Sequence, residues 1–157
     1  FLPNIDESTK PIAVNTAERF ATAGNYRKAI DILLKDNSNP YYSLREYRLA
    51  NYYNKMENKS DSAAYWAKRC MDMKPLCYSP VRVLVNIAGK KGDSQKQLEL
   101  IDSYLEKYQL EPLAWEDKIV ILQRLKKDQE AIETIKKARE YMPRNSKIKK
   151  LEDKLMK

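Results

Sequence analysis

The sequence repeats with a period of 34 residues, and this feature constrains its fold more than any other. One position per period holds alanine or glutamine: Ala29, Ala63, Gln97 and Ala131. An apolar residue follows each of them directly, and another stands four positions after it. A column suited to turns lies five positions before it, formed by Gly24, Asn58, Gly92 and Lys126. Self-similarity at this period indicates stacked repeats, each too small to bury its own hydrophobic face.

Within each repeat, apolar residues recur at spacings of three and four, which is the helical period. The pattern predicts helix pairs at 10–23 and 26–38, 42–57 and 60–73, 78–90 and 94–108, and 112–125 and 128–142. Prolines stand where these helices should begin or end, at Pro40, Pro75, Pro80, Pro112 and Pro143. No run of β-branched residues alternates with polar ones, so the chain is predicted to be all-α.

The period also divides the chain. We expect a leader at 1–9, repeats at 10–43, 44–77, 78–111 and 112–144, and a separate last segment at 145–157. That segment has one apolar stripe, Ile148, Leu151 and Leu155, on an otherwise charged helix. A stacked array needs such a terminal element, because its last repeat would otherwise expose apolar surface. Since the chain begins at Phe1, we expect it to be an excised or processed part of a longer protein.

Further residues recur at matching places in the repeats. The first repeat has Ala17, Phe20, AGNYRKAIDILL at 23–34 and Pro40; the second has Tyr47, Ala50, Tyr53, Ala63, Ala67 and Pro75; the fourth has Trp115, Ile119, Leu122, QEAIETIKKA at 129–138 and Pro143. This pattern resembles the tetratricopeptide repeat (TPR) family. The resemblance implies a right-handed α-solenoid of about four helical hairpins with a C-terminal capping helix. The third repeat departs from it at Gln97, which predicts a looser or locally rotated hairpin.

The resemblance also implies that partners bind on the concave surface formed by the first helix of each pair. The positions carried over to this surface are Arg48, Tyr52, Lys55, Arg82, Asn86, Lys90, Glu116 and Arg124. Asparagine can hold a peptide backbone through a donor and an acceptor, and arginine can grip a carboxylate with two hydrogen bonds. We therefore expect a non-catalytic scaffold that binds an acidic or C-terminal segment of a protein partner. The alternative is that these residues are solvated helix-surface charges.

One sub-type of the family, the carboxylate clamp for chaperone tails, does not fit. Its positions correspond here to Pro11, Asn15, Leu49, Ser79 and Val83, of which only Asn15 matches the clamp.

The net charge of +8 raises a second possibility, binding of nucleic acid or an anionic surface. The segment 124–157 contains 12 basic and 6 acidic residues. These lysines alternate with acids at helical spacing, and no row of aromatic residues accompanies them for base stacking, which favours a solvated cap. A structural spacer between other domains is a further alternative. Tyr41 and Tyr42, which flank a turn, are candidates for an exposed contact patch.

The composition disfavours catalysis. The chain has no histidine, which removes the commonest general base and metal ligand, and its three glycines form no phosphate-binding loop. We expect no cofactor and no metal.

Cys70 and Cys77 are predicted to be unpaired, buried thiols, with a bridge across the Pro75 turn as the alternative. The sequence has no transmembrane stretch and leaves the compartment and oligomeric state open, while its Lys, Asn and Tyr usage is typical of a low-GC bacterial source.

Overall fold

The computed structural model describes residues 12–36 and 43–156, and every regular element among them is an α-helix. The helices are α1 (Ile12–Thr22), α2 (Tyr26–Lys35), α3 (Leu44–Lys55), α4 (Ser60–Met73), α5 (Ser79–Lys90), α6 (Ser94–Lys107), α7 (Pro112–Arg124), α8 (Asp128–Tyr141) and α9 (Ser146–Leu155). Their bounds lie within three residues of the ranges expected from the periodicity. The prediction of an all-α repeat fold is confirmed, whereas the leader at 1–9, Tyr41 and Tyr42 lie outside the described residues.

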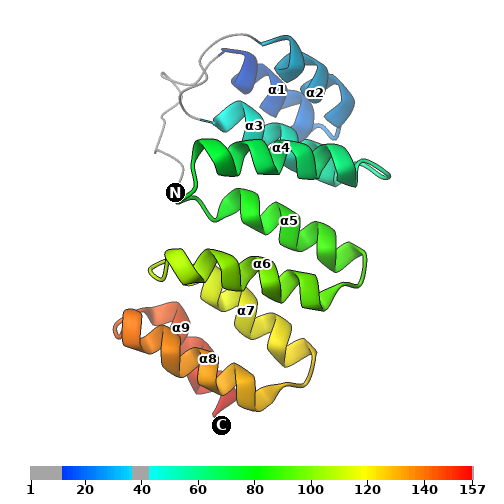
Figure 1. The fold of residues 1–157 in the computed structure, drawn as a ribbon. Helices are drawn as coiled ribbons and strands as arrows, with labels where there is room; N and C mark the ends of the chain where they lie inside the picture. Colours follow the sequence, from blue (N-terminus) through cyan, green and yellow to red (C-terminus); the bar gives the residue numbers. More distant parts are fainter. Residues whose placement is uncertain (1–11, 37–42, 157) are drawn as a thin grey trace. The chain divides into compact units, whose positions relative to one another are not determined.

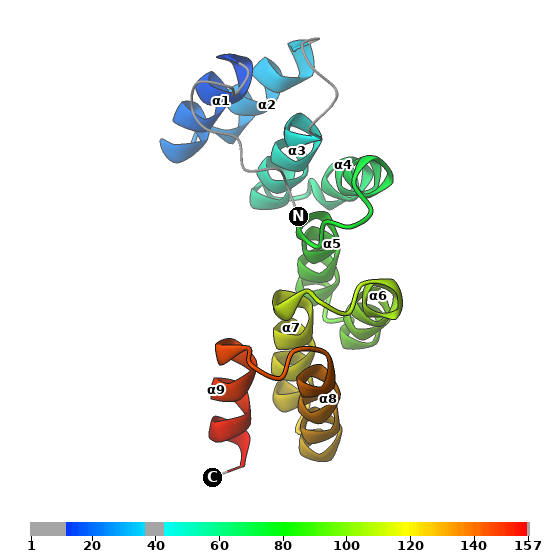
Figure 2. The same cartoon turned by 90° about the vertical axis from the view of Figure 1, so that its left-hand side faces the viewer.

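The chain forms two compact units, divided between Ile87 and Ala88. In the N-terminal unit, α1 pairs with α2 and α3 with α4, and α3 also contacts α1 and α2 (Figure 1). In the C-terminal unit, α7 contacts α6 and α8, and α9 lies against both α7 and α8 (Figure 2). Each unit therefore consists of successive helices that bury one another's apolar faces.

The turn column adopts the backbone conformation that its residues favour. Gly24, Asn58, Gly92 and Lys126 all have positive φ, at 85°, 59°, 72° and 59°. In three of these turns the next residue donates a backbone hydrogen bond across the helix end: Asn25 to Phe20, Asp93 to Ala88 and Lys127 to Leu122. This pattern satisfies helix-terminal carbonyls and requires a left-handed residue. The 34-residue period of the sequence is therefore the spacing between these left-handed turns.

The alanine column lies at the contact between paired helices. Ala29, Ala63 and Ala131 are all fully buried. Two helices approach closely only where one of them presents a small side chain. The residues four positions on, such as Leu33 and Ile135, fill the adjoining space and are buried as well. These positions are structural, as the sequence predicts.

Gln97, which replaces alanine in this column, is accommodated by a glycine. Its side chain is 5% exposed, and a Cβ on Gly89 would lie 2.6 Å from its amide nitrogen Nε2. Its Oε1 accepts a hydrogen bond of 2.7 Å from Nη2 of Arg124. The other repeats have a small alanine at the position of Gln97. Here the absence of a Cβ on Gly89 provides the room for the larger glutamine side chain.

The last helix covers the end of the C-terminal unit. Asn145 caps α9, because its Oδ1 accepts from the backbone N–H groups of Lys147 and Ile148. Ile148 is fully buried, and Arg139 on α8 forms an ion pair of 3.0 Å with Glu152 on α9. The lysines of α9 are exposed, so its outer face is polar.

Both cysteines are free thiols in buried positions, which agrees with the preferred prediction. The Cys70 Sγ donates a long hydrogen bond of 3.7 Å to the carbonyl oxygen of Ser43. Burial raises the pKa of the Cys70 thiol to about 11.

Candidate functional site

The candidate site lies in the N-terminal unit, on the side that the first helices α1 and α3 present. Helix α3 places Arg48, Asn51, Tyr52 and Lys55 at spacings of three and four, so their side chains share one helix face. Together with residues of α1 and the start of α2, they line a cavity of about 460 Å³. The cavity is lined by Glu18, Ala21, Thr22, Tyr26, Arg48, Asn51, Tyr52 and Lys55. We call it the α1–α3 cavity.

One ion pair crosses this cavity. Arg48 Nη2 on α3 lies 2.6 Å from Glu18 Oε1 on α1, and each side chain is roughly a quarter exposed. The Arg48 guanidinium also lies 6.0 Å from the ring centroid of Tyr47. Because Glu18 balances the charge of Arg48, the free positive charge on the wall of the cavity is the ammonium of Lys55.

Two buried polar atoms at this surface have no hydrogen-bond partner among the described residues. They are Nε of Arg48, a donor, and Oδ1 of Asn15, an acceptor. Asn15 lines a neighbouring cavity of about 420 Å³ with Glu18, Arg19 and Thr22. Buried polar groups are nearly always paired, so these two atoms are exceptions, and both are enclosed by protein atoms and not exposed in the cavity.

The floor of the α1–α3 cavity is aromatic. The Tyr26 and Tyr52 rings lie 6.0 Å apart with a tilt of 41°, and Tyr52 is 7% exposed. Burial raises the pKa of Tyr52; the positive charge of Arg48 opposes this rise, whereas Glu18 adds to it. The phenol therefore stays protonated at neutral pH, where its hydroxyl can both donate and accept a hydrogen bond.

The structure brings together three of the eight predicted site residues, Arg48, Tyr52 and Lys55. Arg82 and Asn86 are exposed on α5 of the same unit and do not line this cavity. The other three belong to the C-terminal unit: Lys90 ends α5, Glu116 is half-buried on α7, and Arg124 hydrogen-bonds Gln97. Their role in binding stays a prediction.

Sequence reasoning missed Asn51, which lies between Arg48 and Tyr52 on the same face. The repeat pattern gave no signal for it, because the second repeat is shifted by one residue and Ala50, not Asn51, matches the column of Ala17, Val85 and Ile119. The three apolar members are buried core residues. Asn51 lies one position beyond this column, and only the structure places it at the cavity.

Two other features, a metal-binding cluster and a membrane-spanning helix, are absent from the described residues. Within 12–36 and 43–156, no group of three or more His, Cys, Asp or Glu side chains could hold a metal ion. No helix in these ranges combines the length and the apolar character that crossing a bilayer demands.

The comparisons with known proteins establish the fold. Neither a protein-family model nor a curated protein sequence matches the chain. Solved structures of MamA do match: that of strain AMB-1 at TM-score 0.56 and 19% identity, covering 87% of this chain and 74% of MamA. MamA of strain MSR-1 matches at TM-score 0.53 and 19% identity, covering 87% of this chain and 78% of that one. A MamA mutant gives TM-score 0.53 and 18% identity, with 88% and 81% covered. MamA is a TPR-like helical repeat protein, so this chain has a TPR-like helical repeat fold.

Proposed function

We propose that this chain is a non-catalytic scaffold that binds an extended segment of a protein partner on the α1–α3 face of its N-terminal unit. The observation that carries the proposal is the α1–α3 cavity, where Arg48, Asn51 and Lys55 surround the buried ring of Tyr52. The similarity to MamA supports a helical repeat of the kind that binds proteins.

The cavity indicates the chemistry of the segment. The Asn51 amide can donate to a carbonyl group of an extended backbone and accept from one of its N–H groups. The Lys55 ammonium favours a carboxylate, either from Asp or Glu or from a chain terminus. The Tyr26–Tyr52 pair provides apolar area for one side chain of the segment. We therefore expect an acidic segment with an apolar residue near the carboxylate.

Selection from a random peptide library tests this proposal. We expect enrichment of peptides that carry a carboxylate next to an apolar residue. The affinity of an enriched peptide is then measured by fluorescence anisotropy for the wild type, Lys55→Ala and Asn51→Ala. Each substitution should weaken binding about tenfold, which corresponds to ~1.4 kcal/mol.

The control is Lys35→Ala, which removes the same charge from an exposed position at the end of α2, outside the cavity. It should leave affinity within a factor of two. Equal weakening by Lys35→Ala and Lys55→Ala would show that net charge alone attracts the peptide, and the proposed site would be wrong. Arg82→Ala tests the predicted residue on α5 that does not line the cavity.

The nucleic-acid alternative has a separate test. A labelled RNA of mixed sequence is titrated at low and at physiological salt. Binding through the basic residues of 124–157 would fall steeply with salt, and Lys149→Ala/Lys150→Ala would reduce it. Binding that survives physiological salt and is lost in this variant would replace the proposed function. We expect no binding at physiological salt.

A further inference from the structure

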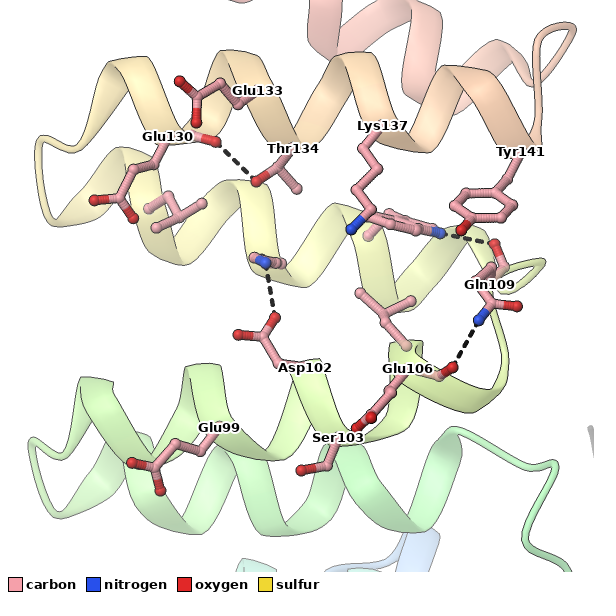
Figure 3. A pocket seen from close by; sticks show the side chains of 14 residues that line it. Glu99, Asp102, Ser103, Glu106, Gln109, Glu130, Glu133, Thr134, Lys137 and Tyr141 are labelled. Atoms are coloured by element: carbon pink, nitrogen blue, oxygen red, sulfur yellow. Dashed lines mark hydrogen bonds and ion pairs between the residues drawn. The ribbon is translucent and has the colours of Figure 1, made fainter.

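A second groove lies in the C-terminal unit, between the outer helices α6 and α8 with α7 at its base (Figure 3). Its volume is about 820 Å³, compared with about 460 Å³ for the α1–α3 cavity. Ligand sites occupy roughly 300–1,000 Å³, so this groove is large enough for a segment of several residues. The base consists of apolar side chains, Trp115 and Leu122 of α7 and Leu105 of α6, which are all buried. We call it the α6–α8 groove.

The walls of the groove are acidic in a chain that is otherwise basic. Glu99, Asp102 and Glu106 stand on the α6 side, and Glu130 and Glu133 on the α8 side (Figure 3). Two lysines, Lys118 and Lys137, also line it, which leaves five carboxylates against two ammonium groups. The net charge of the whole chain is +8. The groove is thus a local reversal of the overall charge.

Part of this negative charge is not neutralised within the groove. Lys118 pairs with Asp102 at 2.7 Å, and Lys127, which stands outside the groove, pairs with Glu130 at 3.8 Å, so these charges cancel. Glu99 and Glu133 accept hydrogen bonds from the neutral amides of Gln95 and Gln129, at 3.3 and 3.4 Å. Both carboxylates are exposed and stand on opposite walls, where they can attract a cation between them.

One end of the groove carries an aromatic pair. The Trp115 ring stacks on Tyr141, with centroids 5.9 Å apart and an angle of 28°. The indole N–H of Trp115 is occupied by the Gln109 carbonyl oxygen at 2.8 Å, which holds the ring in place. Tyr141 is 42% exposed, so its ring remains accessible. Guanidinium and ammonium groups bind to aromatic faces, and this end therefore favours the same kind of ligand as the acidic walls.

We propose that the α6–α8 groove is a second docking surface, which binds a lysine- and arginine-rich segment of a partner protein. The basic side chains lie between the acidic walls and on Tyr141, and an aliphatic residue of the segment lies on the apolar base. Charge complementarity assigns the occupant, because an acidic peptide would meet the net negative charge of these walls. The groove differs in unit, helices and ligand charge from the α1–α3 cavity.

The probe is a fluorescein-labelled peptide of three Arg-Arg-Leu repeats, with a Glu-Glu-Leu peptide of equal length as the reverse-charge control. Fluorescence anisotropy at physiological salt should show binding of the basic peptide only. Glu99→Gln/Glu133→Gln should weaken it at least tenfold, and Tyr141→Leu about threefold. Lys137→Gln should tighten binding, because it removes a positive charge that faces the ligand. Circular dichroism and thermal unfolding show that each variant is folded.

The matched control is Glu140→Gln/Asp153→Asn, which removes two exposed carboxylates of the same unit outside the groove. It should change affinity by less than twofold. Equal weakening by both double variants would mean attraction by net charge alone and would overturn the proposal, as would failure of the basic peptide to bind. Self-association that Glu99→Gln/Glu133→Gln abolishes would overturn the assignment to a partner protein in favour of a second copy. Lys55→Ala should leave this binding unchanged, which separates the two sites.

Discussion

Gly89 and Gln97 form a complementary pair that the repeat pattern alone would count as two irregularities. The Gln97 amide occupies the space that a Cβ on Gly89 would take, and Arg124 holds its other end. A buried amide is tolerated only when it is hydrogen-bonded, so the pair works because both conditions are met. The departure from alanine in the third repeat is thus compensated within the same unit.

A double-mutant cycle measures this coupling. Gly89→Ala has two opposing effects on stability. The higher helix propensity of alanine stabilises the folded state, by less than ~1 kcal/mol because the position is in the last turn of the helix. The new Cβ displaces the Gln97 amide, which destabilises it. We expect the two to cancel roughly, or a net loss of stability. In a Gln97→Ala background the contact is absent, so the same substitution should stabilise the protein. Urea unfolding of the wild type, the two single variants and the double variant gives the coupling free energy between the two positions. Additive effects of the two substitutions would contradict the pairing.

Cys70 leads to a prediction about pH. The folded state favours the neutral thiol, with a pKa of about 11 because of burial, whereas an unfolded cysteine titrates near ~8.5. The unfolded state therefore loses its proton first as pH rises. Stability should be unaffected by this group below pH ~8.5 and should fall between that pH and about 11. The free energy of unfolding is measured at pH 8 and at pH 10.5. The decrease between these two pH values should be smaller for Cys70→Ala than for the wild type.

Thiol reactivity provides an independent check on the same residue. Both cysteines are fully buried. A thiol reagent at pH 8 should therefore react with neither cysteine in the native protein and with both in denaturant. Rapid reaction of one thiol under native conditions would contradict its burial.

At the scale of the element, the helix ends explain why the period is visible. Each first helix of a pair ends with a left-handed residue, and only two of the four are glycine. An L-residue other than asparagine or aspartate is strained in this conformation by about 1–2 kcal/mol, whereas achiral glycine is not. Lys126 at φ 59° carries this strain.

Lys126→Gly should therefore stabilise the protein, by about 1 kcal/mol after the greater freedom of the unfolded chain is deducted. The measurement is the midpoint of urea unfolding, compared between variants whose free energy of unfolding depends on urea concentration with the same slope. The neighbouring Lys127→Gly is the control, because Lys127 has a negative φ of −94° and loses the same charge. It should give no gain, and an equal gain in both variants would point to charge instead of backbone strain.

The cap of α9 is a second feature at this scale. Oδ1 of Asn145 accepts from two backbone N–H groups that would otherwise have no partner within the helix. Asn145→Ala should destabilise the protein by about 1 kcal/mol, whereas Asn145→Asp should retain most of the stability. Hydrogen exchange should show faster opening of α9 in the alanine variant. Unchanged exchange would mean that packing of Ile148 alone holds the helix.

At the scale of the whole molecule, charge is unevenly distributed. The chain carries +8 overall, yet the α6–α8 groove is lined mainly by acidic residues. Ion pairs such as Lys118–Asp102 and Arg139–Glu152 are partly exposed to solvent, and each contributes little to stability. Repulsion between the surplus basic residues should therefore outweigh them.

Added NaCl should accordingly raise the thermal midpoint of unfolding, because screening reduces this repulsion more than it weakens the ion pairs. The gain should level off by a few tenths molar, where the Debye length is already short. Glu140→Gln/Asp153→Asn, with two more net positive charges, should show a larger gain. A midpoint that falls with salt would mean that the ion pairs dominate.

The sequence alone determined the local part of this protein. Helix ranges, turn positions and the small residues at helix contacts follow from a period of 34, since each depends on residues close in the chain. Arg48, Tyr52 and Lys55, which were carried over from the TPR resemblance, share one helix face, and their role in binding stays a prediction. The tertiary structure decided which residues of different helices meet, because the period describes only residues that are close in the chain. The Glu18–Arg48 pair, the fit of Gln97 against Gly89 and Arg124, and the meeting of acids from α6 and α8 join different helices. Their side chains come together only through packing, so neither their contacts nor the charge of the grooves they line can be read from spacing.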